Sequence, residues 1–425
     1  MGTSENKVKD YIKKINESGL NSVIELNPKA LEEAHKCDNS ENKTLPLHGV
    51  PILIKDNVNT KGMITSAGSI ALTSNITQED APIVKLIREA GAVILGKANM
   101  TEFANYMVDF RKDEKMPNGY SSRGGQCINP HGSEHDPSGS STGSAVAVAA
   151  GLVSMAIGSE TYGSIISPSQ NCGIVGIKPT ASSVSTEGVI PISHTLDILG
   201  PMTKTVDDAA KLLGVIQNKE YAVSPNRTAR VGVYKHYMEH AKADWVEANK
   251  GLLDKMEALG MDIFHLDIEP IDERPVFPIM EYEFKHSINS YLKTYGAEGV
   301  PANLEEIIAY NNANSDIALK YGQGNLIIAN EKNESWDKEK IYTDAIKERD
   351  EAIKQLDRIF DENNLDIIFL ASAHCGVGAF TGFPTMTVPI GFTTDNAPIG
   401  CCILAGRDQE DILINVAKVI EDIIK

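Results

Sequence analysis

Short apolar runs alternate with amphipathic stretches along this chain, and this alternation constrains its fold more than any other feature. Val50–Ile54 and Ala92–Leu95 are short apolar runs, and residues 81–90 between them have helical spacing. Residues 228–267 repeat the pattern as strand, helix and strand, and Leu253 lies on the apolar side of that helix. Helices that alternate with buried strands cover the faces of a sheet. The sequence therefore predicts an α/β layered fold.

The same periodicities predict elements elsewhere in the chain. Helical spacing runs through the first forty residues, including Val23 and Ile24, and through the polar stretch 280–360. The apolar stretch Ala145–Ile157 is interpreted as a buried helix that begins near Ser144. Two further buried strands and a closing helix are expected at Asp366–Leu370, Thr385–Val388 and Asp411–Ile424.

Length and composition indicate one large globular unit. The chain has 425 residues, of which 42% are hydrophobic, and this is enough to bury a sizeable core. At about 150 residues per domain the length alone suggests two or three domains, but large α/β enzymes often exceed that figure as one unit. Because no repeat, low-complexity tract or linker divides the sequence, we expect a single domain over residues 1–425.

Charge and hydropathy exclude several classes of partner. The 58 acidic residues exceed the 40 basic ones and give a formal charge of −18, which repels nucleic-acid phosphates. No stretch reaches the roughly 18 apolar residues of a membrane span, and the first residues lack the apolar segment of a secretory signal. The six cysteines form no CxxC pair, so neither a disulfide scaffold nor a zinc ribbon is expected. These features favour the reducing cytoplasm.

Three segments carry residue types suited to nucleophilic catalysis. Lys55 and Asp56 follow an apolar strand, Ser138–Ala145 is a hydroxyl-rich turn that enters a helix, and Gly158–Ile165 contains a second turn with Ser164 near its end. Taken singly, a strand-end lysine is usually a solvated charge, and a glycine and serine run is usually a loop. Their order and spacing change that interpretation, because Ser164 lies 24 residues after Ser140.

In these segments the sequence resembles the amidase signature family. The resemblance continues through four later segments: Cys172–Thr180, Gly188–Pro191, Leu196–Met202 and Thr381–Pro389. It implies that family's fold, a single-domain α/β/α sandwich around a large mixed β-sheet. It also implies a catalytic triad with Lys55 as the base, Ser140 as a bridging serine on a cis peptide bond, and Ser164 as the nucleophile. Ser141 and Asp56 are expected to support the triad.

The proposed roles agree with the chemistry of amide hydrolysis. A serine hydroxyl needs a base to take its proton, and lysine is a base only when it is neutral. Burial at the end of the strand at 50–54 would lower the pKa of Lys55 from its usual value of about 10.4. Ser140 would relay the proton, and the backbone N–H groups of Thr161, Tyr162, Gly163 and Ser164 would face the oxyanion. The resemblance implies no metal and no cofactor.

Several strings are most similar to the bacterial peptide amidase branch of the family, whose members remove the C-terminal amide of peptides. They are Tyr120–Gln126, Gly158–Thr161, Glu283–Lys285, Tyr291–Leu292 and Asn303–Ile308. Three residues depart from the wider family pattern. Thr142 replaces a small residue, Tyr162 stands where Gly or Asp is usual, and Ile166 stands where many members have Arg. Tyr162 is expected to narrow the substrate pocket.

The resemblance also divides the chain by role, with residues 46–215 as the signature core that holds the triad. Residues 216–365 are expected to form a variable helical region on the substrate side, and residues 366–425 to return to the core sheet. The predicted activity is hydrolysis of a primary carboxamide, in a peptide or a small molecule, through an acyl-enzyme. Two alternatives remain, namely the A subunit of a glutamyl-tRNA amidotransferase and a non-catalytic binding protein with this fold. The sequence predicts no oligomeric state.

Overall fold

The computed structural model describes residues 3–109, 111–112, 115–239, 241–333, 335–370 and 376–425. Of the six cysteines, Cys375 lies outside these ranges. In the described part of the chain the other five are free thiols, at positions 37, 127, 172, 401 and 402.

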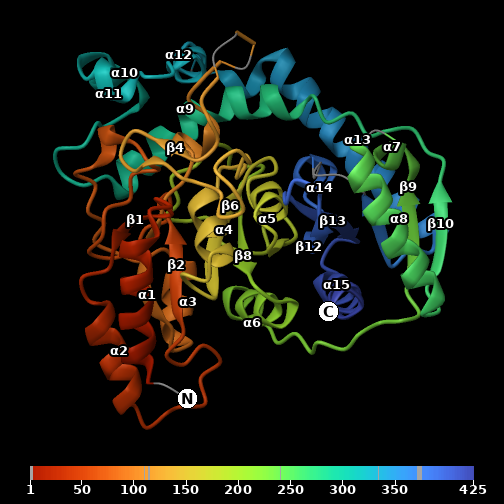
Figure 1. The fold of residues 1–425 in the computed structure, drawn as a ribbon. Helices are drawn as coiled ribbons and strands as arrows, with labels where there is room; N and C mark the ends of the chain where they lie inside the picture. Colours follow the sequence, from red (N-terminus) through yellow and green to blue (C-terminus); the bar gives the residue numbers. More distant parts are fainter. Residues whose placement is uncertain (1–2, 110, 113–114, 240, 334, 371–375) are drawn as a thin grey trace.

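A mixed sheet forms the centre of the molecule (Figure 1). Over the described residues it has eleven strands, which are β1 (Val23–Leu26), β2 (Pro51–Lys55), β3 (Val93–Ala98), β6 (Met155–Glu160), β7 (Val175–Lys178), β8 (Ile198–Thr203), β9 (Arg230–Tyr234), β10 (Asp262–Leu266), β11 (Ile367–Leu370), β12 (Thr385–Phe392) and β13 (Pro398–Ala405). Their order across the sheet is β1-β3-β2-β6-β8-β7-β12-β13-β11-β9-β10. β2 is parallel to both β3 and β6, and β9 is parallel to β10 and β11, whereas the other pairs are antiparallel.

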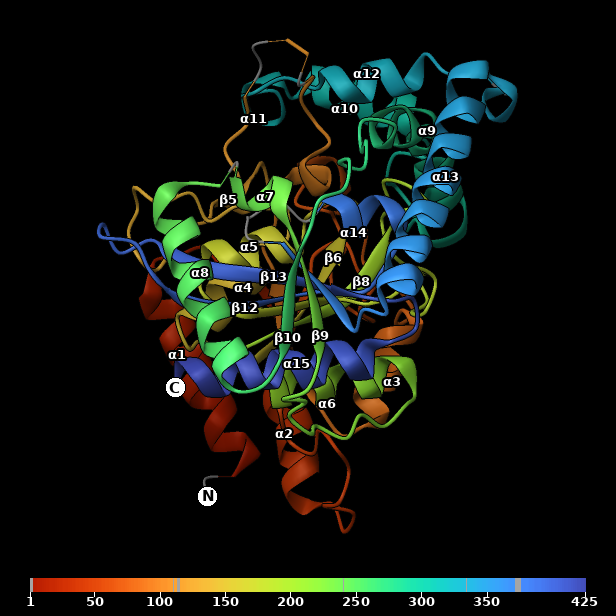
Figure 2. The same cartoon turned by 90° about the vertical axis from the view of Figure 1, so that its right-hand side faces the viewer.

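Helices cover both faces and one edge of this sheet. In chain order they are α1 (Ser4–Ser18), α2 (Ala30–Asn39), α3 (Pro82–Glu89), α4 (Thr142–Ala149), α5 (Ile166–Asn171), α6 (Val206–Gln217), α7 (Lys235–Glu239), α8 (Ala243–Ala258), α9 (Val276–Tyr295), α10 (Leu304–Ala313), α11 (Ser315–Ala318), α12 (Gly324–Asn330), α13 (Lys340–Asn363), α14 (Gly376–Thr381) and α15 (Glu410–Ile424). A small hairpin, β4 (Tyr120–Ser121) with β5 (Gly125–Gln126), lies outside the main sheet. In Figure 2, α4 and α5 lie above the sheet, and α3, α6 and α15 lie below it.

Two hydrophobic cores result from the alternation of side chains along the central strands. Leu53 of β2 and Ala156 of β6 belong to the core that includes α4, whereas Ile54 and Ile157 belong to the core that includes α3, α6 and α15. Successive side chains of a strand point to opposite faces, so a strand covered on both faces must be apolar throughout. The chain is therefore a single-domain α/β/α sandwich with a large mixed sheet, as the resemblance implied.

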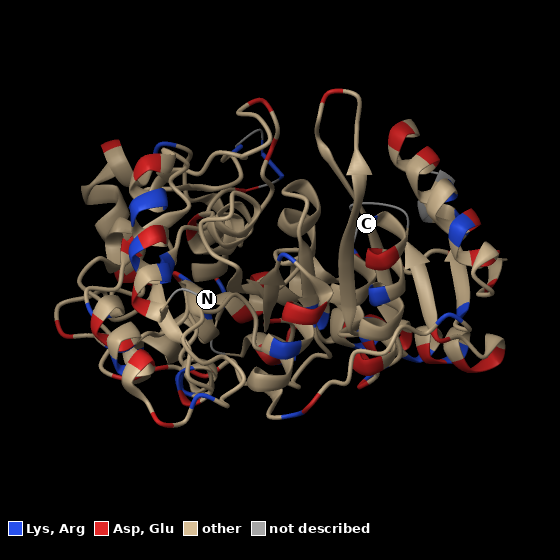
Figure 3. Ribbon diagram, turned by 60° about the horizontal axis from the view of Figure 1, so that its bottom comes forward, with Lys and Arg blue, Asp and Glu red and all other residues tan. Residues whose placement is uncertain are grey.

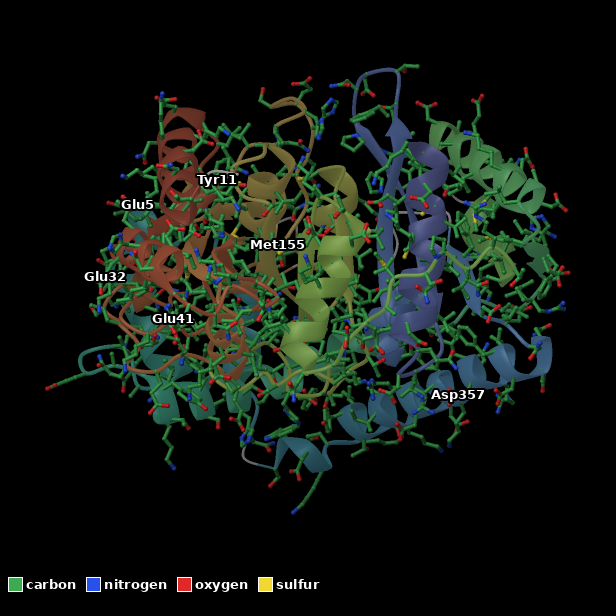
Figure 4. The ribbon with its side chains drawn as sticks, turned by 90° about the horizontal axis from the view of Figure 1, so that it is seen from below. Glu5, Tyr11, Glu32, Glu41, Met155 and Asp357 are labelled. Atoms are coloured by element: carbon green, nitrogen blue, oxygen red, sulfur yellow. The ribbon has the colours of Figure 1, made fainter. Side chains whose placement is uncertain are left out.

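The charged side chains lie mainly around the periphery. Figure 3 shows Asp, Glu, Lys and Arg concentrated on the outer helices and loops, whereas the central strands are largely free of them. In Figure 4, Met155 lies among the central elements, while Glu5, Glu32 and Asp357 lie near the outside. In the described part of the chain, no helix combines the length and the apolar character that crossing a lipid bilayer requires.

Most of the expected elements are present, but two assignments were wrong. Val23 and Ile24 lie in strand β1, where helical spacing was expected, because this short segment pairs with β3 at the edge of the sheet. The buried helix expected over Ala145–Ile157 ends at Ala149, and Met155–Ile157 begin β6. A short apolar run fits a buried helix and a buried strand equally well, and here the pairing of β6 with β2 and β8 decides the conformation.

The topology determines where a functional site can form. β2 and β6 are parallel neighbours, with Ile54 opposite Ile157, so their carboxyl ends reach the same edge of the sheet. Lys55 is the last residue of β2, and Thr161 follows the last residue of β6. α9 crosses above this edge in Figure 1. The carboxyl ends of parallel strands are the usual place for a ligand site in α/β proteins.

Candidate active site

Lys55 is fully buried where the ends of β2 and β6 meet. Its Nζ atom lies 2.8 Å from Ser140 Oγ, 2.9 Å from Ser141 Oγ and 3.0 Å from the backbone oxygen of Ser159. Ser159 belongs to β6, so the pairing of the two strands places this carbonyl beside the amine. The structure therefore brings together the lysine and the first two serines that the sequence predicted as site residues.

Burial changes the protonation of this lysine. Removal from water lowers the pKa of Lys55 to about 7, because the ammonium form loses its hydration, while the charges of Asp197 and Glu160 oppose the change. At neutral pH a large fraction of Lys55 is thus an uncharged amine that can accept a proton. A solvated lysine would hold its proton under the same conditions.

The serine-rich turn is held closely against the sheet. The peptide bond between Gly139 and Ser140 is cis, which is the form that the family resemblance implied. The backbone N–H of Thr101 donates to the Ser140 carbonyl at 3.1 Å. A side chain at Gly139 would place its Cβ 2.4 Å from Thr101 Oγ1, so this position requires glycine. The turn ends where α4 begins at Thr142, whose methyl-bearing side chain is accommodated without displacing Ser140 from Lys55.

Ser141 has a different hydrogen-bond pattern from Ser140. Its hydroxyl donates to the Ser159 carbonyl at 3.0 Å and accepts from the Ser159 N–H at 3.2 Å. The single hydroxyl proton of Ser141 is thus committed to β6, and this serine anchors the turn. Its backbone N–H also donates to the Ser164 carbonyl at 3.2 Å, which joins the two serine-bearing turns.

Ser164 lies on the turn that follows β6 and retains 8% exposure. Gly163, before it, has a φ of +90°, a conformation that favours glycine. Glu160 holds the turn from within, because one of its carboxylate oxygens accepts the N–H of Ile165 at 2.7 Å and that of Ile166 at 3.0 Å. Burial raises the pKa of Glu160 above the usual carboxyl value. Glu160, at the end of β6, therefore helps to hold the conformation of this turn.

Thr161 and Tyr162 are fixed by two acids that the sequence did not single out. The Thr161 hydroxyl donates to Asp197 Oδ1 at 2.5 Å, and burial raises the pKa of Asp197 to about 6. The Tyr162 hydroxyl donates to Glu273 Oε2 at 2.7 Å, and its ring meets Phe277 of α9 edge-on at 6.0 Å between centroids. The Tyr162 side chain thus packs against α9 and the segment just before it.

Asp56, predicted as a supporting residue, is hydrogen-bonded to Ser66, Gly68 and Arg123. Its carboxylate accepts from Ser66 Oγ at 2.5 Å, from the Gly68 N–H at 2.9 Å and from Arg123 Nη1 at 3.0 Å. These bonds fold the segment after β2 against the sheet. Lys97 of β3 is a second buried lysine nearby, and burial lowers its pKa to about 8.

The acids around the site were missed because their partners are distant in the sequence. Asp197 lies 36 residues from Thr161, and Glu273 lies 111 residues from Tyr162. A single acidic residue in a helix or loop normally indicates a solvated charge, so no sequence pattern distinguishes these two. Glu160 is the exception, since its place at the end of β6, four residues before Ser164, could have suggested a role. In the described residues, no group of three or more His, Cys, Asp or Glu is arranged to hold a metal ion.

Comparisons with known proteins identify the family. The family model described as Amidase matches residues 6–377. A probable amidase of Arabidopsis thaliana is 35% identical over 98% of this chain and 86% of its own length. The A subunit of the glutamyl-tRNA(Gln) amidotransferase of Methanocaldococcus jannaschii is also 35% identical, but over 66% of this chain and 66% of its own.

Solved structures extend the likeness to the whole fold. The native peptide amidase of Stenotrophomonas maltophilia is 31% identical, with a TM-score of 0.89, and the match covers 100% of this chain and 94% of that one. An amidase family protein of Bacillus anthracis has the same identity and TM-score, and the match covers 100% of this chain and 88% of that one. The chain therefore belongs to the amidase family and is an amide-hydrolysing enzyme.

Proposed function

We propose that this enzyme hydrolyses a primary carboxamide to a carboxylate and ammonia, and that its substrate is the C-terminal amide of a peptide or a small amide. Ser164 is the nucleophile, Ser140 the proton relay and Lys55 the base. The observation that carries the proposal is the fully buried Lys55 amine, 2.8 Å from the Ser140 hydroxyl where two parallel strands end. The likeness to a peptide amidase over the full chain supports the substrate class.

The hydrogen bonds around Lys55 support one direction for the proposed proton relay. A neutral amine has two N–H groups and one lone pair, and Lys55 has three oxygen neighbours. The Ser159 carbonyl can only accept, and the Ser141 hydroxyl already donates to that carbonyl. The lone pair is therefore left for the proton of Ser140. Once protonated, the amine donates to all three oxygens.

We propose the following reaction. Ser164 Oγ attacks the amide carbon while its proton passes to Ser140 and the Ser140 proton passes to Lys55. The N–H groups of residues 161–164 stabilise the oxyanion. Collapse of the intermediate breaks the C–N bond, and the proton returns through Ser140 to the leaving nitrogen, which departs as ammonia. Water then attacks the acyl-enzyme by the same route, which releases the carboxylate and restores Ser164.

Ammonia release from a panel of peptide amides and small primary amides tests the proposal. Wild-type turnover that disappears in Ser164→Ala and in Lys55→Ala would support the assigned roles. Equal ammonia release by wild type and Ser164→Ala would indicate a contaminant or another nucleophile. Unchanged turnover in Lys55→Ala would reject the base assignment. Asp10→Asn, on the exposed face of α1, is a suitable control because its only ion pair in the described chain is with Lys14.

We also propose that the three regions of the chain have separate roles. Residues 46–215 provide the triad, residues 216–365 form the substrate side, and residues 366–425 complete the sheet. The contact of Phe277 and Glu273 with Tyr162 supports the second role. β12 and β13 support the third. The free thiols of the described cysteines are compatible with a reducing cytoplasm, where we place the enzyme.

An amidotransferase A subunit is the second candidate, because such subunits are 35% identical to about two thirds of the chain. The charge of −18 and the full-length likeness to a peptide amidase favour the first candidate. Purification of the tagged protein from its own cells distinguishes the two. Recovery of stoichiometric partner subunits, together with glutamine hydrolysis that depends on them, would support the amidotransferase.

A further inference from the structure

Another buried acid is linked to the turn that carries Ser164. Glu283, in the middle of α9, is fully buried. One carboxylate oxygen accepts from Ser193 Oγ at 2.5 Å and from the Thr195 N–H at 3.1 Å. The other oxygen accepts from Thr195 Oγ1 at 2.5 Å and from the Tyr342 hydroxyl at 2.8 Å. Four donors from two other segments thus converge on one side chain of α9.

These bonds determine the shape of the loop 192–197. Asp197 Oδ2 closes the loop, because it accepts the N–H of Ile192 at 2.8 Å and that of Ser193 at 3.1 Å. Ser193 Oγ, which donates to Glu283, also accepts the Leu196 N–H at 3.2 Å. Two acids therefore hold the loop by hydrogen bonds: Asp197, which belongs to the loop, and Glu283, which belongs to α9.

The loop in turn reaches the nucleophile turn. Asp197 Oδ1 accepts from the Thr161 hydroxyl at 2.5 Å, and Thr161 lies three residues before Ser164. A continuous series of hydrogen bonds thus runs from Glu283 through the loop to Thr161. The charge of Glu283 also contributes to the raised pKa of Asp197, which agrees with the closeness of the two acids.

We infer that Glu283 is a positioning residue that holds the loop 192–197 against α9, so that Asp197 fixes Thr161 and the oxyanion-binding N–H groups. The catalytic part of this inference rests on the proposed function. The inference assigns α9 a role in catalysis in addition to its contact with Tyr162. Tethering by Glu283 makes the geometry of the 161–164 turn depend on α9, which begins at Val276, 112 residues after Ser164.

Glu283→Gln is the direct test because it keeps the size of the side chain. One of the two acceptor oxygens becomes an NH2 group, which faces donors and leaves part of the network unpaired. For a small primary amide we expect kcat to fall about tenfold or more and KM to stay within about twofold, since misplaced oxyanion donors act on the transition state. Glu281→Gln, on the same helix, is the matched control. Its carboxylate pairs with Arg111 and Lys332, away from the loop.

Hydrogen exchange gives a readout that does not need turnover. In Glu283→Gln the amides of residues 161–166 are expected to exchange faster than in the wild type, and in Glu281→Gln at the wild-type rate. Wild-type kcat and wild-type exchange in Glu283→Gln would overturn the inference. If the wild type released no ammonia from any amide, the proposed function would fail. The exchange rates alone would then decide whether Glu283 holds the turn in position.

A second variant covers the case in which Glu283→Gln does not fold. Thr195→Val removes one hydroxyl donor to Glu283 and leaves the acid and its other partners in place. We expect a smaller decrease in kcat, about threefold, and faster exchange in residues 161–166. No change in either quantity would overturn the inference.

Discussion

The amine of Lys55 has three oxygen neighbours and no exposure to water, so its protonation should govern the rate. Its pKa is about 7, and the ammonium form below that value cannot take a proton. We therefore expect kcat/KM to rise with pH through about 7 and then level off, because this parameter reports ionisation of the free enzyme. Rate measurements between about pH 5 and 9, with circular dichroism to confirm folding at each pH, provide the check. An acidic limb centred near pH 4 would indicate a carboxylate base.

The second prediction at the residue scale concerns the substitution Asp197→Asn, for which we expect two effects. Asp197→Asn removes a charge that raises the pKa of Lys55, so the acidic limb of the pH profile should move to lower pH. The same change weakens the acceptor for the Thr161 hydroxyl, and we expect kcat on the plateau to fall about tenfold. An acidic limb that moves upward, or does not move, would contradict the assigned charge interaction. Glu187→Gln, on the exposed surface before the loop, serves as the charge-matched control.

Among the elements, α4 is packed closely against neighbouring backbone. A Cβ atom at Gly143 would lie 2.4 Å from the backbone oxygens of Asn99 and Ser22, so Gly143→Ala must shift the helix that follows Ser140. We expect kcat to fall at least about tenfold and the melting temperature to fall as well, since small displacements of catalytic groups are costly. Activity assays and thermal melts measure the two effects.

The control for this prediction is a glycine in an open helix. Gly251 lies in α8, is exposed, and has no atom within 4 Å of the position that a Cβ would occupy. Gly251→Ala should keep wild-type activity and stabilise the protein by about 0.5–1 kcal/mol through helix propensity. If Gly143→Ala and Gly251→Ala had the same activity and melting temperature, close packing of α4 would not be the reason for glycine at position 143.

The elements also show what a sequence can predict and what it cannot. β2 and the strands on either side of α8 were recognisable, because apolar runs with clear flanks have one plausible conformation. β6 was not, since Met155–Ile157 continue an apolar segment that begins in α4, and only pairing across the sheet separates strand from helix. Lys55, Ser140 and Ser164 could be proposed because the segments that contain them resemble the motifs of the amidase family. Asp197 and Glu283 lie in segments that resemble the family, but no role could be assigned to either, because only folding brings their hydrogen-bond partners near.

At the scale of the whole molecule, the sheet runs without a break through both halves of the chain. Its continuity predicts one cooperative unfolding transition. The two tryptophans test this, because Trp245 packs in the core below the sheet and Trp336 contacts His194 on the other side. In the single-tryptophan variants Trp245→Phe and Trp336→Phe, the urea midpoints should coincide. Separate midpoints would reveal two independently stable parts.

The place of β12 and β13 in the sheet has a consequence for biosynthesis. These late strands lie between β7 and β11, so the two halves of the sheet cannot join before residues 385–405 have been made. Until then β7 has an unpaired edge, and a nascent chain with such an edge is prone to associate with its neighbours. A chaperone that covers this edge during synthesis is therefore expected to raise the yield of folded enzyme.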